Sequence, residues 1–73
     1  MDIIGRWIDE RCVKGPFEAK TADLYTDYED WTRKEIGFSM SRIAFGRELV
    51  DRGFESKKVG GQRGVRGLKI GPI

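Results

Sequence analysis

The sequence contains no histidine and a single cysteine among its 73 residues. Without histidine the chain lacks the side chain that most often acts as a general base near neutral pH, so a self-contained hydrolytic triad is hard to build. Cys12 has no partner for an internal disulfide, and one thiol without histidine is far short of a zinc shell. We therefore expect a protein of a reducing compartment that holds no metal and no cofactor and is not an enzyme.

Long hydrophobic runs are also missing. No apolar stretch approaches the roughly 18–20 residues that cross a bilayer, and the N-terminus does not resemble a signal peptide. With hydrophobic residues at 38% and charged residues at 36%, the composition is that of a small folded domain rather than a disordered tail. A chain of this length has one core. We expect a single cytoplasmic domain over residues 1–73 that does not bind membranes.

The two halves of the chain differ in charge, which the net charge of +2 conceals. Residues 1–36 hold six Lys/Arg and nine Asp/Glu, whereas residues 37–73 hold eight and three, so the halves carry −3 and +5. Eight of the ten glycines also lie in the second half. This asymmetry indicates an acidic scaffold that presents a basic, glycine-rich face to an anionic partner.

Apolar periodicity predicts three helices, over residues 3–13, 21–35 and 42–52. Thr21 and Ser41 are the expected N-caps of the second and third helices, because their hydroxyls can accept free backbone amides. Gly53 is the expected residue after the third helix. The predicted core residues are Ile4, Trp7, Ile8, Leu24, Tyr28, Trp31, Phe45, Leu49 and Val50.

Four other residues carry specific expectations. Gly46 is costly inside a helix, so we expect it at a close approach to a neighbouring helix. Cys12 is expected to be a buried thiol, whereas Tyr25 falls beside the apolar stripe and is a candidate surface aromatic. Asp27 is expected on the solvated face of the second helix.

After the third helix the helical period ends, and the pattern becomes that of a β-hairpin. Segments 54–59 and 65–70 flank a glycine-rich turn at 60–64. Residues 16–19 are expected to form an extended connector or a short strand. We therefore predict an α+β fold, a winged helix-turn-helix with three helices followed by a β-hairpin wing.

In that architecture the third helix enters the major groove of DNA and the wing lies along the backbone or minor groove. Arginine suits both places because its planar fork bonds a guanine edge or a phosphate bidentately, and free amides at the start of the third helix suit a phosphate. The alternatives are a solvated helix face and lysines that protect a sheet edge. The candidate DNA-binding residues are Ser41, Arg42, Ala44, Arg47, Lys57, Lys58, Arg63, Arg66 and Lys69.

The order of several short motifs resembles the small C-terminal domain of phage- and plasmid-type primase–helicases. That family has an "ERC" segment, a "LY..Y..W" helix, an "S...FG..L...GF" stretch and an "RG..GL" ending. The matching residues are Glu10, Arg11, Cys12, Leu24, Tyr25, Tyr28, Trp31, Ser41, Phe45, Gly46, Leu49, Gly53, Phe54, Arg63, Gly64, Gly67 and Leu68. The resemblance implies a winged-helix domain of a larger replication protein, attached to a superfamily 3 helicase in a bacterial host cell. It implies no catalytic residues here.

The expected function is double-stranded DNA binding that anchors a replicative primase–helicase at its template or origin. The first alternative is a protein-interaction module that docks to the helicase and primase domains of the same parent protein, or to another replication factor, through the acidic second helix. The second alternative is binding of RNA or single-stranded DNA.

Overall fold

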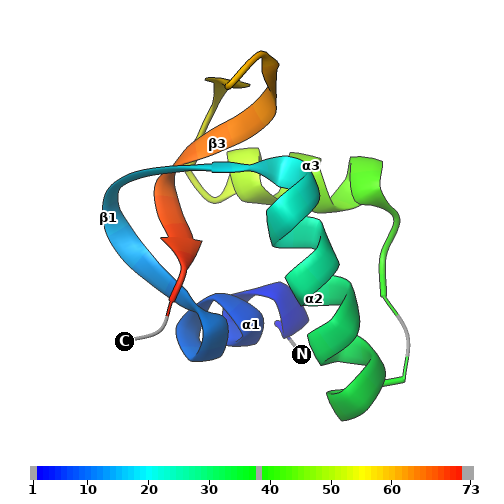
Figure 1. Cartoon of the computed structure of the whole chain (residues 1–73). Coiled ribbons are helices and arrows are strands. Elements are labelled where there is room, and N and C mark those ends of the chain that lie inside the picture. The colour runs from blue at the N-terminus through cyan, green and yellow to red at the C-terminus, as the bar shows by residue number, and fades with distance from the viewer. Residues whose placement is uncertain (1, 38, 72–73) are drawn as a thin grey trace.

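The computed structural model describes residues 2–37 and 39–71. Over these residues the chain forms three helices and one three-stranded antiparallel sheet, whose strands lie in the order β1-β3-β2 (Figure 1). The elements are α1 (Ile3–Arg11), β1 (Cys12–Lys20), α2 (Thr21–Glu35), α3 (Arg42–Asp51), β2 (Glu55–Val59) and β3 (Gln62–Ile70). The α+β class is thus as expected, and residues 16–19, expected as an extended connector or a short strand, are part of the longer, nine-residue strand β1.

The first two helices follow the predicted periodicity with small changes at their ends. Helix α1 begins after Asp2, whose carboxylate accepts the amide of Gly5, and it ends at Arg11 rather than at residue 13 because Cys12 is extended. Helix α2 has the predicted bounds, but the expected cap is wrong: Thr21 is the first helical residue and is buried. Its N-cap is Lys20, which makes no side-chain hydrogen bond to the helix.

Helix α3 has the expected start and stop. The hydroxyl oxygen of Ser41 accepts the backbone amide of Ala44 at 3.2 Å, as an N-cap does. Gly53 has a φ of +95°, and its amide bonds to the carbonyl of Val50 while the amide of Phe54 bonds to that of Leu49. These two hydrogen bonds are those of a Schellman motif. The motif requires a residue in the left-handed conformation, which glycine adopts without strain.

Two expectations for α3 are wrong. Val50 is not in the core but 47% exposed, because it projects beside the buried face rather than along it. Gly46 does not sit at a tight helix contact, since a Cβ built there would meet only the Cγ2 of Thr21, at an ordinary 3.9 Å.

The hairpin turn is tighter than predicted. Gly60 and Gly61 alone form it, with φ values of +58° and +80°, so both central residues adopt the left-handed conformation that a type I′ turn needs. Strand β3 is correspondingly longer than its predicted segment, since it begins at Gln62, which already pairs with Val59. The hairpin tip extends beyond the last pair of β1 and β3, Lys20 with Gly64.

The alternation of side-chain faces along β3 is interrupted at Gly67, which we call the phase change of β3. The register of β1 against β3 shifts between Lys14 and Glu18, and Gly67, opposite the shift, has a φ of +123°. A Cβ there would also lie 2.8 Å from the Phe54 ring, so this position requires glycine. Val65 and Leu68, three residues apart, are consequently both buried against the helices, although strict alternation would place them on opposite faces.

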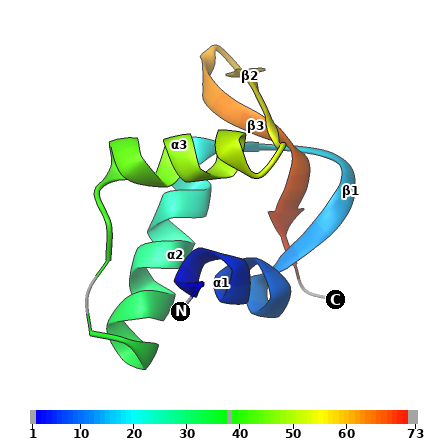
Figure 2. The same ribbon diagram turned by 180° about the vertical axis from the view of Figure 1, so that it is seen from behind.

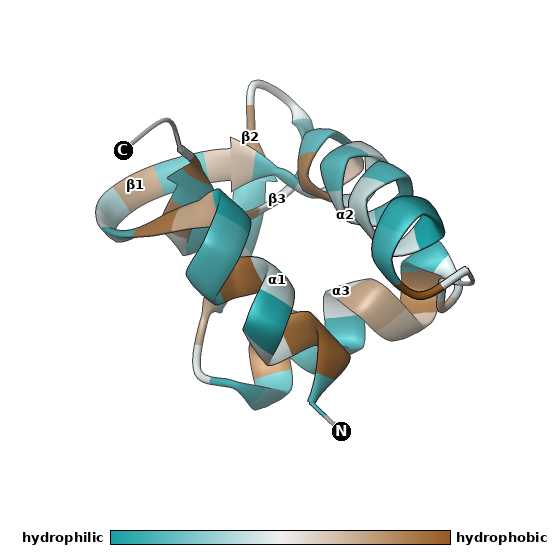
Figure 3. Cartoon of the chain, turned by 90° about the horizontal axis from the view of Figure 1, so that it is seen from below, coloured by the Kyte–Doolittle hydropathy of each residue, from teal (hydrophilic) through white to brown (hydrophobic). Residues whose placement is uncertain are grey.

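One aromatic cluster lies where the three helices meet the sheet. The ring of Phe45 lies 5.4 Å from that of Trp7 and 4.8 Å from that of Tyr28. Seen from below, the helices surround this core, with hydrophobic and hydrophilic residues alternating around each (Figure 3). Tyr25, expected as a surface aromatic, is partly buried against this core: its hydroxyl donates to the carbonyl of Met40, and its ring meets that of Phe45. The predicted burial of Trp7, Tyr28 and Phe45 is confirmed.

Candidate nucleic-acid interface

An open groove of about 660 Å³ separates α3 from the β2–β3 hairpin. In Figure 2 the hairpin rises beside α3 on the side away from α1. The residues that line it are Thr21, Arg42, Ile43, Gly46, Arg47, Val50, Ser56, Arg63 and Val65.

The geometry of α3 determines which of its side chains enter the groove. Phe45 and Leu49 are fully buried and fix the inward face of the helix. Ile43, Gly46 and Val50 recur at spacings of three and four, so they form a second stripe along the adjacent face. This stripe, which we call the groove stripe, is flanked by two arginines that also line the groove, Arg42 and Arg47.

The hairpin supplies the opposite wall. Arg63 pairs directly with Lys58, and two residues further along Val65 pairs with Ser56, so these side chains share one face of the hairpin. Arg63 and Val65 both line the groove, which places Lys58 on the same side. The two-residue turn sets Arg63 close to the tip, where the glycines leave the backbone open to a ligand.

Three arginines line the groove, two from α3 and one from the hairpin, and a lysine lies beside the third arginine on the same face of the hairpin. We call them the groove cations: Arg42, Arg47, Lys58 and Arg63. Within residues 2–37 and 39–71, no carboxylate lies within ion-pair distance of any of them, whereas Lys57 pairs with Glu18 and Arg52 with Asp2. A concentration of cations without local counter-ions creates a positive potential that attracts an anionic ligand.

Three other predicted binding residues lie elsewhere on the sheet. Lys57 and Arg66 are not groove residues: Lys57 is ion-paired to Glu18, and Arg66 stands in the sheet row between Glu18 and Glu55. Lys69 packs over the ring of Phe17, 4.4 Å from its centroid. The alternation of strand faces and the phase change in β3 explain this division.

The start of α3 differs in one respect from expectation. The amide of Ala44, proposed as free for a phosphate, is already bonded to the hydroxyl of Ser41. Ser41 and Ala44 are exposed, but neither lines the groove. Ser41 thus positions the helix that carries Arg42 and Arg47.

Sequence reasoning missed the groove stripe. Ile43 is 75% exposed and Val50 is 47% exposed, the largest exposed hydrophobic side chains among the described residues. Both line the groove between the groove cations. The spacing of Ile43, Gly46 and Val50 was visible in the sequence and marked a second apolar stripe on α3.

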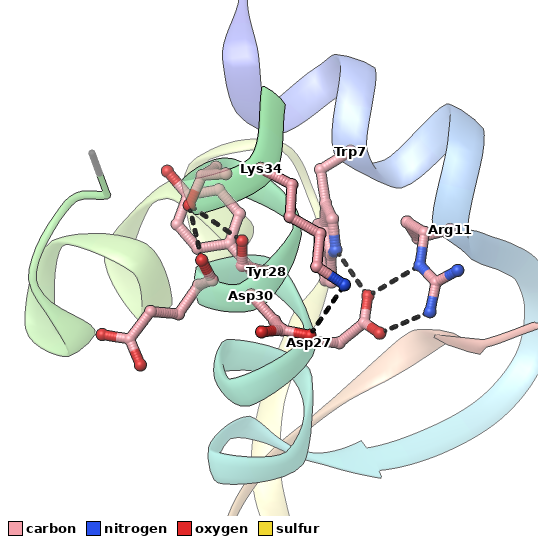
Figure 4. A network of polar contacts seen from close by, with 8 residues as sticks. Trp7, Arg11, Asp27, Tyr28, Asp30 and Lys34 are labelled. Carbon is pink, nitrogen blue, oxygen red and sulfur yellow. Dashed lines mark hydrogen bonds and ion pairs between the residues drawn. The ribbon is translucent and has the colours of Figure 1, made fainter. Parts of the chain in front are cut away.

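The acidic second helix, by contrast, is engaged within the fold (Figure 4). The carboxylate of Asp27 accepts hydrogen bonds from the indole of Trp7 at 2.9 Å and from the guanidinium of Arg11 at 2.7 and 3.1 Å. Its side chain is only 19% exposed, so its expected place on a solvated face is wrong. The hydrogen bond from Arg11 is the main reason that the pKa of Asp27 is lowered. Asp30, about one helical turn after Asp27, pairs with Lys34 at 3.7 Å.

Three other features bear on function: possible metal ligands, the single thiol and the length of the helices. Within residues 2–37 and 39–71, no group of three or more Cys, Asp or Glu side chains is placed to hold a metal ion. Burial raises the pKa of Cys12 to about 12, which keeps its thiol protonated at neutral pH. Among the helices described, none is both long enough and apolar enough to cross a bilayer.

No protein-family model, no curated protein and no solved structure matches the chain.

Proposed function

We propose that this protein binds double-stranded DNA as a winged helix-turn-helix domain, with α3 as the recognition helix and the β2–β3 hairpin as the wing. The observation that carries the proposal is that the four groove cations, without ion-pair partners among the described residues, lie in or beside one open groove. The succession of α2, α3 and a hairpin, with a third strand holding the hairpin to the body, supports the same architecture.

The dimensions of α3 suit the major groove. A ten-residue helix is about 15 Å long, and the major groove of B-DNA, about 12 Å wide, admits one helix. Arg42 and Arg47 then lie where a bidentate guanidinium can bond a guanine edge or a phosphate. Arg63 and Lys58, near the flexible glycine turn, contact backbone phosphates, which position the domain without selecting a sequence.

The proposed biological setting is the anchoring of a phage or plasmid replicative primase–helicase at its template or origin. It rests on the motif resemblance alone. Docking to another protein through the acidic second helix is less favoured, because Asp27 and Tyr25 are held by internal hydrogen bonds.

The test is a salt titration of binding to duplex DNA, with single-stranded DNA and RNA as competitors. Four phosphate contacts predict a log–log slope of about −3.6 between affinity and salt concentration. A slope near zero, or preferential displacement by single strands or RNA, would overturn the proposal.

The matched variants are Arg63→Ala and Arg33→Ala. Each removes one exposed arginine, but Arg33 lies on α2, paired with Glu29 and away from the groove. We expect Arg63→Ala to weaken binding to all duplexes and to reduce the slope by about one, with Arg33→Ala unchanged. Equal losses in the two variants would show that net charge, and not the groove, governs binding.

A further inference from the structure

The groove stripe is an apolar surface that the fold leaves uncovered. Ile43 is three-quarters exposed and Val50 nearly half exposed, yet both line a groove whose walls carry three arginines. Two branched aliphatic side chains at the centre of the groove would contribute nothing to the electrostatic binding of phosphate. Their burial by a ligand would be favourable in proportion to the apolar area covered.

Nothing in the fold explains why a glycine stands at position 46, between Ile43 and Val50. Glycine inside a helix is less stable than alanine, and here neither a positive φ nor a crowded neighbour requires it. An added methyl group would meet only Thr21, at 3.9 Å, and would otherwise point into the groove. A residue that weakens its helix without a packing reason is a mark of a functional site.

We propose that the groove stripe contacts the 5-methyl groups of thymine in the major groove, with Gly46 as the point where the base edges approach the helix backbone. This inference rests on the proposed DNA binding and specifies what the domain recognises. The thymine methyl is the apolar group on the major-groove edges of the base pairs, and aliphatic side chains are its usual partners.

The arrangement of charge favours DNA over an acidic protein segment. A duplex presents two rows of phosphates on either side of a floor of base edges. The groove has the complementary form, with Arg42 and Arg47 on one wall, Arg63 on the other and the apolar stripe between them. Val50 lies seven residues after Ile43, roughly 10 Å along the helix, which spans about three base-pair steps.

The first experiment removes the methyl groups from the DNA. A preferred duplex is enriched from a randomised pool, and each thymine in it is replaced in turn by deoxyuridine. At a contacted thymine we expect affinity to fall about fourfold, the equivalent of one buried methyl group. In the Ile43→Ala variant the difference between thymine and deoxyuridine should vanish at one position, and in Val50→Ala at another.

The second experiment separates binding from stability. Gly46→Ala should raise Tm by about 4–8 °C, because alanine favours the helix, while it weakens binding to the enriched duplex at least tenfold. Ala22→Gly, on α2 and outside the groove lining, is the control: it should lower Tm and leave the affinity of the folded protein unchanged.

The outcomes distinguish this inference from the proposed function. Salt-dependent duplex binding that enriches no sequence, or that is indifferent to deoxyuridine and to Gly46→Ala, would overturn the inference and leave DNA binding in place. Absence of duplex binding at any salt concentration would overturn both.

Discussion

The two halves of this small domain use charged side chains differently. Among the described residues, four of the six basic side chains before residue 37 form ion pairs within that half: Arg6, Arg11, Arg33 and Lys34. In the second half only two of the eight, Arg52 and Lys57, form ion pairs among the described residues: Arg52 pairs with Asp2 and Glu48, and Lys57 pairs with Glu18.

Three acidic residues of the first half, Asp2, Glu18 and Asp27, join different elements of the fold, whereas the groove cations of the second half have no ion-pair partner among the described residues. The strongest internal use is at Asp27, which joins α2 to α1 through Arg11 and Trp7. Charge without a partner, rather than net charge, identifies the candidate binding surface.

The largest expected effect contrasts the two faces of α3. Phe45→Ala should lower the free energy of unfolding by about 3–5 kcal/mol, because a fully buried ring that contacts Trp7 and Tyr28 is lost. Ile43→Ala, two residues away, should change it by less than about 0.5 kcal/mol because Ile43 is exposed. Urea denaturation measures both, and a large loss for Ile43→Ala would show that the groove stripe belongs to the core.

The next effect concerns the internal use of charge. Asp27→Asn should cost about 1–2 kcal/mol, since it weakens hydrogen bonds to Arg11 and Trp7, whereas Asp30→Asn, which affects an exposed pair, should cost less than about 1 kcal/mol.

The same two variants test how the stability contributed by Asp27 depends on pH. The pKa of Asp27 is lower in the folded protein than the unfolded value of about 3.9, so its stabilisation is complete well above pH 4. It is lost as the pH falls through the folded-state pKa. Denaturation measured from pH 7 to pH 2 should show a smaller acid-induced loss in Asp27→Asn than in Asp30→Asn; parallel curves would contradict this assignment.

The smallest effect is expected in the groove. Replacing Arg47 and Arg63 together by Ala should leave the free energy of unfolding within about 0.5 kcal/mol of the original, because neither forms an ion pair among the described residues. Thermal denaturation at low and high salt checks this. A marked loss of stability would mean that these arginines serve the fold, and the contrast between the halves would fail.

Much of the fold was predictable because it is encoded locally. The spacing of apolar residues within each helix placed Trp7, Tyr28 and Phe45 in the core. Ser41 and Gly53 marked the two ends of α3 through their own cap chemistry. These signals depend only on residues within a few positions of each other.

The remainder depends on partners distant in the chain. Strand β1 was read as a connector because Gly15 and Pro16 interrupt it, and its pairing with β3, about fifty residues later, overrides that local preference. The division of the basic hairpin residues between two faces depends on the phase change at Gly67, and the engagement of Asp27 depends on the packing of α1. Neither could be seen from local patterns.

The last strand of the sequence is the middle strand of the sheet, and this affects how the protein is made. Strands β1 and β2 both pair with β3, and Val65 and Leu68 of β3 complete the core. A nascent chain that has emerged only as far as the glycine turn therefore has no sheet to join, and its folding awaits the synthesis of β3. Strand β3 completes both the core and the hairpin wall of the groove, so the groove and the native fold arise together.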